Sequence, residues 1–209
     1  MDLFNQNDLF DTEEPLKTVF DLPGADITFY DYFFTKSESN KLFESLLKKI
    51  NWQQDNLKIY GKLIKLPRLT AWYGDTNKPS SNNNLNPWNE ELLFIKKRLE
   101  KEINVEFPRC LLNLYRDGND SVDWHQDYDG KTRENTTIAS VTFGESRPFQ
   151  LKHVNRKDLK RVDIPLSHGS LLLMKGATQL NWKHKIPKTT KQIHPRINLT
   201  FRHINQGTY

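Results

Sequence analysis

Apolar and polar residues alternate with a period of two along much of the second half of the chain. The clearest case is residues 196–202. Its apolar positions are Ile197, Leu199 and Phe201, and its polar positions are Arg196, Asn198, Thr200 and Arg202. Residues 110–115 and 138–143 show the same period, and residues 171–174 form a short, wholly apolar run. Because successive side chains of a strand point to opposite faces, this half of the chain predicts many short strands.

The first half contains two stretches with helical periodicity. Thr35 and Glu38 form a capping box that opens the first helix. One face of that helix carries Leu42, Phe43, Leu46, Leu47 and Ile50. The second helix is predicted to begin with Asn86 as N-cap and Pro87 in the first position. Its buried positions are Leu92, Ile95, Leu99 and Ile103.

Helices are predicted in the first half of the chain and strands in the second, and these elements together indicate the fold class. Residues 57–73 look extended, with Gly61 as a turn, and residues 74–86 form a polar loop. We expect a mostly β protein with flanking α-helices: a β-sandwich or jelly roll buttressed by helices on one side. Residues 1–16 read as a mobile acidic tail, and residues 17–209 as a single domain.

The charge of the chain is unevenly distributed. Of its 209 residues, 31 are Lys or Arg and 26 are Asp or Glu, which gives a net charge of +5. Five of the acids lie in the tail, so the remaining body is more basic than this value. A basic body suits a polyanionic partner, although solubility alone also explains such charge.

The composition also limits where in the cell the protein is expected and which residue types could bind a metal. The longest apolar run is too short for a membrane span, and the N-terminus lacks the order of a secretory signal, so a cytoplasmic location is expected, or a nuclear one in a eukaryote. Cys110 is the only cysteine, which excludes an internal disulfide and a cysteine-based zinc site. A metal would therefore need histidine and carboxylate ligands.

His125 and Asp127 stand two residues apart in an extended segment, so both side chains point the same way and can reach one ion. Two histidines and one carboxylate form the facial triad of non-haem iron oxygenases, although such ligands also suit zinc. An H-x-D pair also arises by chance. The candidates for the third ligand are His153, His168, His184, His194 and His203, and spacing alone does not choose among them.

Arg196 and Arg202 lie on one face of the last predicted strand. An interior arginine needs a fixed anion, and its guanidinium pairs with carboxylates in a bidentate manner. A dicarboxylate such as 2-oxoglutarate would satisfy both arginines. The alternative is that this face is simply solvated, which is common in antiparallel sheets.

Ordered sequence blocks between residues 59 and 202 resemble the AlkB family of iron(II)/2-oxoglutarate dioxygenases, particularly the branch of the human nucleic-acid demethylases. The blocks are residues 67–75, 113–118, 121–127, 138–144, 168–172 and 195–202. The resemblance implies a double-stranded β-helix, with His184 as the third iron ligand and Arg196 on the far carboxylate of 2-oxoglutarate. The rest of the implied co-substrate pocket is Asn113, Tyr115, Asn198, Thr200 and Arg202.

The same resemblance implies an activity. Iron(II), O2 and 2-oxoglutarate would be used to demethylate N-methylated bases of the 1-methyladenine and 3-methylcytosine type in DNA, with release of succinate, CO2 and formaldehyde. The alternatives are an RNA demethylase, a dioxygenase that acts on protein, and a nucleic-acid-binding module without catalysis. We expect a monomer.

By the same resemblance, we expect residues 52–86 to include a nucleotide-recognition lid. Chemistry on a base requires that the base leave the stack, and an apolar wedge can fill the gap. Ile59 and Tyr60 are the expected wedge. The other expected substrate contacts are Arg68, Trp72, Tyr73, Asp75 and Asp129. Relatives carry aromatic residues just beyond Asp75, whereas residues 76–84 contain none here.

The acidic tail contains Gln6, Leu9 and Phe10 in an order that resembles the Gln-x-x-Leu-Phe peptides of bacterial repair proteins, which bind the sliding clamp. Leu9 and Phe10 would fill an apolar groove while Gln6 makes polar contacts. The alternative is that Leu9 and Phe10 pack on the surface of this protein itself.

Overall fold

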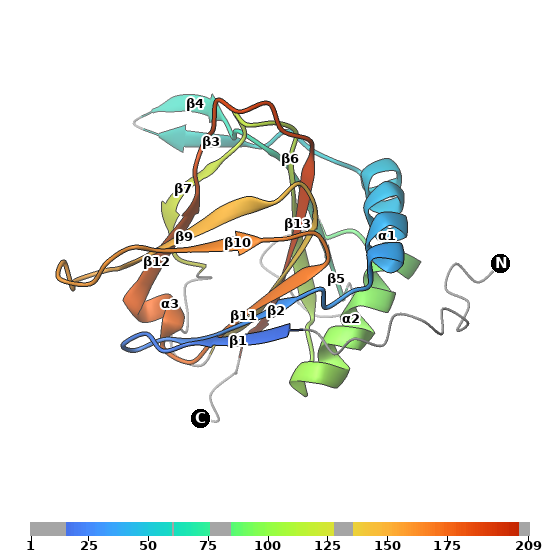
Figure 1. Cartoon of the computed structure of the whole chain (residues 1–209). Helices are drawn as coiled ribbons and strands as arrows, with labels where there is room; N and C mark the ends of the chain where they lie inside the picture. The colour runs from blue at the N-terminus through green and yellow to red at the C-terminus, as the bar shows by residue number, and fades with distance from the viewer. Residues whose placement is uncertain (1–15, 60, 76–84, 128–135, 205–209) are drawn as a thin grey trace.

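The computed structural model describes residues 16–59, 61–75, 85–127 and 136–204. These residues form two facing antiparallel sheets, a separate hairpin and three helices (Figure 1). The larger sheet contains, in spatial order, β1 (Leu16–Phe20), β2 (Asp26–Asp31), β11 (Ser170–Lys175), β8 (Thr136–Gly144), β13 (Arg196–Ile204), β6 (Arg109–Tyr115) and β5 (Leu69–Gly74). The smaller sheet contains β10 (Val162–Leu166), β9 (Arg147–His153), β12 (Trp182–Ile186) and β7 (Val122–His125).

The remaining elements flank the sheets. The hairpin pairs β3 (Asn56–Ile59) with β4 (Lys62–Lys65), and Gly61 at its turn has a positive φ of 78°, which glycine adopts without strain. Helices α1 (Lys36–Lys49) and α2 (Glu90–Ile103) lie beside the larger sheet, on the side away from the smaller one (Figure 1). The short helix α3 (Thr178–Asn181) leads into β12. This arrangement confirms the expected jelly roll buttressed by helices.

Two apolar cores occupy the two faces of the larger sheet. The outer core joins the helices to the sheet and includes Leu42 and Leu46 of α1, Leu92, Ile95 and Leu99 of α2, and Ile197, Leu199 and Phe201 of β13. The inner core lies between the sheets and includes Phe149 and Leu151 of β9 together with Leu172 and Met174 of β11. The apolar side of β13 therefore faces the helices, and its polar side faces the space between the sheets.

Local sequence explains where α1 begins. The Thr35 hydroxyl accepts a hydrogen bond from the Glu38 amide at 3.2 Å, and the Glu38 carboxylate accepts one from the Thr35 amide at 2.9 Å, which confirms the predicted capping box. Leu42 and Leu46 are fully buried, but Leu47 is 36% exposed and lies off the buried face. Among the described residues, no helix has the length and apolar character needed to cross a membrane.

The predicted start of the second helix is wrong. α2 begins at Glu90, and its N-cap is Asn89, whose side chain accepts a hydrogen bond from the Leu92 amide at 2.9 Å. Asn86 instead forms a β-bridge with Tyr73, and its amide group donates to the Trp72 carbonyl at 2.9 Å. Because that side chain is already bonded to β5, it is not free to cap a helix.

Strands β1 and β2 are also absent from the sequence prediction. β1 begins at Leu16, a residue that was expected in the mobile tail. Along β1 apolar residues do not mark a buried face, since Leu16 and Val19 are 70% and 67% exposed. The strand is held by its backbone pairing with β2, which a hydrophobic pattern does not report.

Replacing Asn89 with alanine should lower the free energy of unfolding by about 1 kcal/mol, because the first turn of α2 loses its side-chain cap. Urea denaturation followed by circular dichroism measures this loss. The matched control is Asn155→Ala, an exposed asparagine that contributes only its backbone amide to a hydrogen bond in the described structure. Equal stability of the two variants would contradict the assignment of the cap.

Candidate active site

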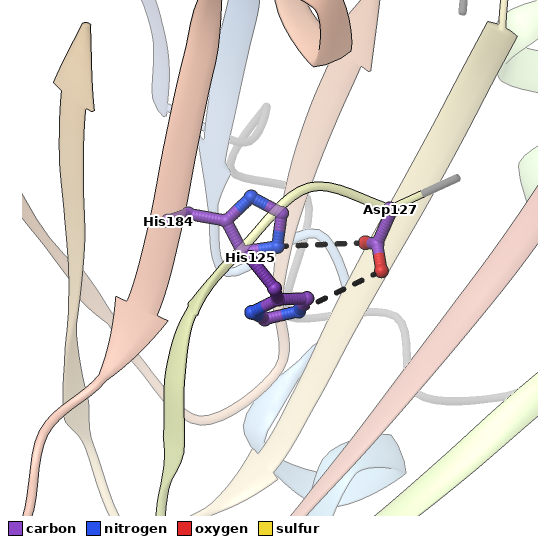
Figure 2. Close-up of side chains that lie close together, drawn as sticks. All are labelled: His125, Asp127 and His184. Atoms are coloured by element: carbon purple, nitrogen blue, oxygen red, sulfur yellow. Dashed lines mark ion pairs between the residues drawn. The ribbon is translucent and has the colours of Figure 1, made fainter. Parts of the chain in front are cut away.

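Three metal-binding side chains converge between the sheets, where β7 ends. His125 is the last residue of β7 and lies directly opposite His184 of β12, while Asp127 follows two residues after His125. The Asp127 carboxylate lies 3.8 Å from His125 Nε2 and 3.6 Å from His184 Nε2 (Figure 2). The potential ligand atoms all lie within 4.8 Å of one another, so they can share one ion.

The imidazole of His125 is prepared for metal binding. Its Nδ1 lies 2.8 Å from the Asp123 carbonyl oxygen. A carbonyl only accepts hydrogen bonds, so Nδ1 carries the hydrogen and Nε2 keeps its lone pair for the metal. Burial, together with the neighbouring His184, lowers the pKa of His125 to about 4, and Asp127 offsets only part of that effect. At neutral pH the ring is therefore uncharged.

The ring of His184 is held by packing. It stacks on Phe149, with the ring centroids 4.7 Å apart and the planes at 22°. The side chain is almost completely buried, and its Nδ1 has no hydrogen-bond partner in the described part of the chain. Its Nε2 faces Asp127 (Figure 2). The stacked orientation leaves Nε2 as the metal-binding nitrogen.

Asp127 is kept ionised by its surroundings. Burial alone would raise the pKa of this carboxyl, but the Arg202 guanidinium and the two imidazoles outweigh burial and hold the pKa well below its usual range. Arg202 Nη2 donates a hydrogen bond to Asp127 Oδ1 at 2.8 Å. Arg202 therefore orients the carboxylate that completes the triad.

Helix α3 supports the segment that carries Gln126 and Asp127. The Gln179 side chain accepts a hydrogen bond from the Asp127 backbone amide at 2.8 Å, and Gln126 Nε2 donates to the Gln179 carbonyl at 2.7 Å. Gln179 is 1% exposed. Since α3 runs directly into β12, these bonds fix Asp127 relative to the strand that carries His184. Sequence patterns give no signal for this contact, because the partners are 52 residues apart.

The polar face of β13 is buried, so the alternative of a solvated face is wrong. Arg196 is 1% exposed, and Asn198 and Thr200 are 7% and 6% exposed. Arg196 Nη2 donates to Thr142 Oγ1 at 2.9 Å, and the guanidinium lies 5.1 Å from the centroid of the Tyr115 ring. Burial lowers the pKa of Arg196 to about 10, so the group stays charged at neutral pH.

Several buried donors on this face have no partner within the described structure. They are Nε and Nη1 of Arg196 and Nε of Arg202. Buried charged groups are normally paired and fully hydrogen-bonded, since an unpaired one is costly. The unpaired donors face a pocket and therefore indicate an anionic ligand.

That pocket connects the arginines to the triad. It encloses about 490 Å³ of empty space, part of it open to solvent. Its lining includes all the residues predicted for the co-substrate: Asn113, Tyr115, Arg196, Asn198, Thr200 and Arg202. His125, Asp127 and His184 line it as well. The donor set of two histidines and a carboxylate fits iron(II), and the unpaired guanidinium donors fit the carboxylate of a bound 2-oxo acid.

The other four histidines lie elsewhere. The His153 ring accepts hydrogen bonds from the amides of its own loop, and His168 Nδ1 accepts one from the Gly144 amide. The backbone amide of His194 donates to Glu145, and His203 Nδ1 lies 2.7 Å from the Glu106 carbonyl. Of the five candidates, the structure brings only His184 to the pair formed by His125 and Asp127.

The expected base contacts are dispersed. Arg68 lines the pocket and donates to Asn113 Oδ1 at 2.8 Å, and Trp72 lies under Arg202, 5.7 Å from ring centroid to guanidinium. Tyr73 does not fit its expected role, because it is 6% exposed and belongs to the outer core. Asp75 accepts a hydrogen bond from Trp88 Nε1 at 2.7 Å.

Some expected contacts lie outside the described residues: Tyr60, Asp129, and the tail with Gln6, Leu9 and Phe10. Residues 76–84, which lack the aromatic residues of the relatives, lie outside them as well. The same holds for the side chain of Ile59, whose backbone ends β3.

A facial triad between the sheets of a jelly roll, with buried arginines behind it, defines the class of the protein as a non-haem iron oxygenase. Residues 26–202 match the family model of the 2OG-Fe(II) oxygenase superfamily. The chain belongs to that superfamily, and the relatives described next place it in the AlkB family.

The chain is similar to alpha-ketoglutarate-dependent dioxygenase alkB homolog 3 of Bos taurus, with 38% identity over 180 residues that cover 81% of this chain and 63% of that protein. The human homolog 3 is 36% identical over 84% of this chain and 65% of that protein. Human DNA oxidative demethylase ALKBH2 is 32% identical over 84% of this chain and 72% of that protein. The matched region thus spans just under two thirds of the homolog 3 proteins.

A solved structure, that of OsALKBH1, shares the fold. Its TM-score is 0.59 over 88% of this chain and 99% of that chain, at 14% sequence identity. At this identity the likeness supports the jelly roll alone.

Replacing Gln179 with leucine should weaken metal binding by about tenfold or more, because the Asp127 amide loses the acceptor that fixes the ligand. Titration of Mn(II) or Co(II) into the purified protein measures the affinity. Gln150→Leu is the matched control, since it removes one part-buried side-chain hydrogen bond, to Asp163, on the face of β9 opposite to the triad. The same metal affinity in both variants would show that Gln179 does not position Asp127.

Proposed function

We propose that the protein is an iron(II)- and 2-oxoglutarate-dependent dioxygenase that removes N-methyl groups of the 1-methyladenine and 3-methylcytosine type from DNA bases, releasing succinate, CO2 and formaldehyde. The observation that carries this proposal is the buried stripe of unpaired guanidinium donors behind a facial triad. When bound, iron and 2-oxoglutarate would allow O2 to act as the oxidant, with one oxygen atom going into succinate and the other into the methyl group, which then leaves as formaldehyde.

Each residue of the site has a defined task in this proposal. His125, Asp127 and His184 hold the metal and leave coordination positions open. Arg196, held between Thr142 and the Tyr115 ring, binds the far carboxylate of 2-oxoglutarate. Arg202 binds Asp127 and so keeps the carboxylate ionised and oriented. Phe149 shields one side of His184 from water.

Charge and the relatives support a nucleic-acid substrate. The body of the chain is basic, and similar proteins include one named as a DNA oxidative demethylase. Arg68 at the pocket and Trp72 beside Arg202 are the base contacts that the described residues favour. Tyr60 as a wedge and Asp129 as an acidic contact to a cationic base complete the proposal. RNA or protein substrates are the alternatives that the assay below separates.

Formaldehyde release from oligonucleotides that contain 3-methylcytosine or 1-methyladenine tests this function. We expect turnover on DNA that depends on iron(II) and 2-oxoglutarate, and turnover on matched RNA or on methylated peptides should be lower. His184→Ala should leave less than about a tenth of the activity, since loss of a metal ligand costs more than tenfold. His153→Ala, a histidine away from the triad, should keep it.

Two results would overturn the proposal. One is the absence of formaldehyde with all nucleic-acid substrates at saturating iron. The other is equal activity of the His184→Ala and His153→Ala variants, because it would remove His184 from the reaction.

We further propose that Gln6, Leu9 and Phe10 dock the protein onto a sliding clamp, which presumes a bacterial host. A free peptide of residues 1–16 should bind a bacterial clamp saturably, with a Kd of about 1 mM or tighter, which corresponds to ~4 kcal/mol. The Leu9→Ala, Phe10→Ala peptide is the control. Identical signals from the two peptides would contradict docking.

A further inference from the structure

Trp124 lies among lysine side chains on the outer face of the smaller sheet. The Lys152 Nζ lies 4.2 Å and the Lys185 Nζ 4.7 Å from the centroid of the Trp124 ring. The three residues come from β9, β12 and β7, and β12 lies between the other two strands. A Trp124 ring that contacts Lys152 therefore lies across the outer face of β12.

Alternation along the strands places the lysines outside. Leu151 of β9 and the flanking Trp182 and His184 of β12 are buried between the sheets, so Lys152, Lys183 and Lys185 project to the opposite face. This face is turned away from α1 and α2 (Figure 1). Lys152 and Lys183 are direct cross-strand partners. Like charges in that position destabilise a sheet, so stability does not explain why they are there.

These lysines differ from the other cations of the region. Arg156 is paired with Asp158 at 2.5 Å, and Arg161 with Asp163 at 2.8 Å. In contrast, no carboxylate of the described chain forms an ion pair with Lys152, Lys183 or Lys185. The negative face of the Trp124 indole ring attracts cations and holds the ammonium groups of Lys152 and Lys185 near one place.

The position of this cluster links it to the active site. Trp124 immediately precedes the metal-binding residue His125, and Lys185 immediately follows His184. The same two strands thus carry metal ligands on the inner face and the cation cluster on the outer face. When one base of a nucleic-acid strand occupies the pocket, its flanking phosphates stay outside, so a phosphate site is expected on outward-facing residues next to the metal ligands.

We propose that Trp124, Lys152 and Lys185 form a phosphate-binding site for the single strand that flanks the target base. This inference rests on the proposed function and adds where the backbone of the substrate runs. Lysine contacts to phosphate release condensed counterions, so each contact contributes to the salt dependence of binding. The site binds any sequence, since phosphates are the same at every position.

The test is binding of a fluorescein-labelled, unmodified single-stranded DNA 12-mer to the full chain, measured by anisotropy across a range of salt concentrations. The Lys152→Ala, Lys185→Ala variant should bind about ten- to thirtyfold more weakly at 0.1 M salt. The slope of log K against log salt is negative, and its magnitude should decrease by about 1.4, which is ~0.7 for each of the two lost phosphate contacts. The Trp124→Leu variant, which keeps both charges but not the ring, should also weaken binding.

The matched control is Lys41→Ala, Lys48→Ala, which removes the same charge from exposed positions of α1 on the far side of the larger sheet. It should retain affinity and slope. Far-UV circular dichroism and thermal unfolding of the Lys152→Ala, Lys185→Ala variant should match those of the wild type, which shows that the variant is folded.

The outcomes separate this site from the proposed function. Equal weakening by both lysine pairs, or no weakening by Lys152→Ala, Lys185→Ala, overturns the site. Selective weakening supports it, even when no methylated DNA yields formaldehyde, a result that overturns only the demethylase function. Wild-type protein that does not bind the 12-mer also overturns the site, whereas the demethylase function is tested by formaldehyde release.

Discussion

A guanidinium group placed inside a jelly roll needs an anion, and most of this structure follows from that constraint. Arg196 lies on the inner face of β13 with Nε and Nη1 unpaired among the described residues. Leaving such donors without a hydrogen-bond partner is costly. A carboxylate that accepts hydrogen bonds from them replaces the hydrogen bonds to water that burial removes. The fold therefore maintains a cationic interior surface whose natural complement is a ligand rather than another part of the described protein.

This constraint determines which face of β13 points into the space between the sheets. Its polar side chains face the space between the sheets, and Ile197, Leu199 and Phe201 face outward. An outward apolar face must be covered, and α1 and α2 cover it, with Trp88 stacked on Phe201 at 6.1 Å just before α2. The buried arginines thus make the helices necessary, because without α1 and α2 the apolar outer face of the larger sheet would be exposed to water.

Asp127 connects this cationic surface to the metal ligands. Its carboxylate lies between Arg202 on one side and the two imidazoles on the other, while Gln179 fixes its backbone. An isolated buried carboxylate would favour the neutral form. Here the surrounding positive charge keeps it ionised and able to bind a metal. Arg202 and a metal therefore act on the same group, and neither is independent of the other.

The patterns that depend on neighbours in sequence predicted the fold well. Period two placed β6, β8 and β13, a short apolar run placed β11, and the Thr35 capping box placed the start of α1, because all these signals depend on residues only a few positions apart. Local sequence did not decide between two residues that are equally suited to cap the second helix. Asn86 and Asn89 both suit an N-cap, and only tertiary contacts decide between them.

Within the site, His125 and Asp127 were evident from their spacing, and the resemblance supplied His184 and Arg196. Nothing local distinguishes His184 from the other histidines, since its position opposite His125 is a property of sheet pairing. Gln179 and Thr142 were not predicted at all, because each acts through a partner more than 50 residues away in sequence. Tyr73 was wrongly expected at the substrate, although alternation along β5 puts it on the side opposite Trp72.

The central claim is that the unpaired donors of Arg196 are there to bind a second carboxylate beside the metal. The most direct measurement is calorimetric titration of the Mn(II)-loaded protein with 2-oxoglutarate and with 2-oxobutanoate, which keeps the 2-oxo acid group but lacks the far carboxylate. A charged hydrogen bond contributes about 1.5–3 kcal/mol, so we expect 2-oxobutanoate to bind at least about tenfold more weakly. Equal affinity for the two acids would contradict the account.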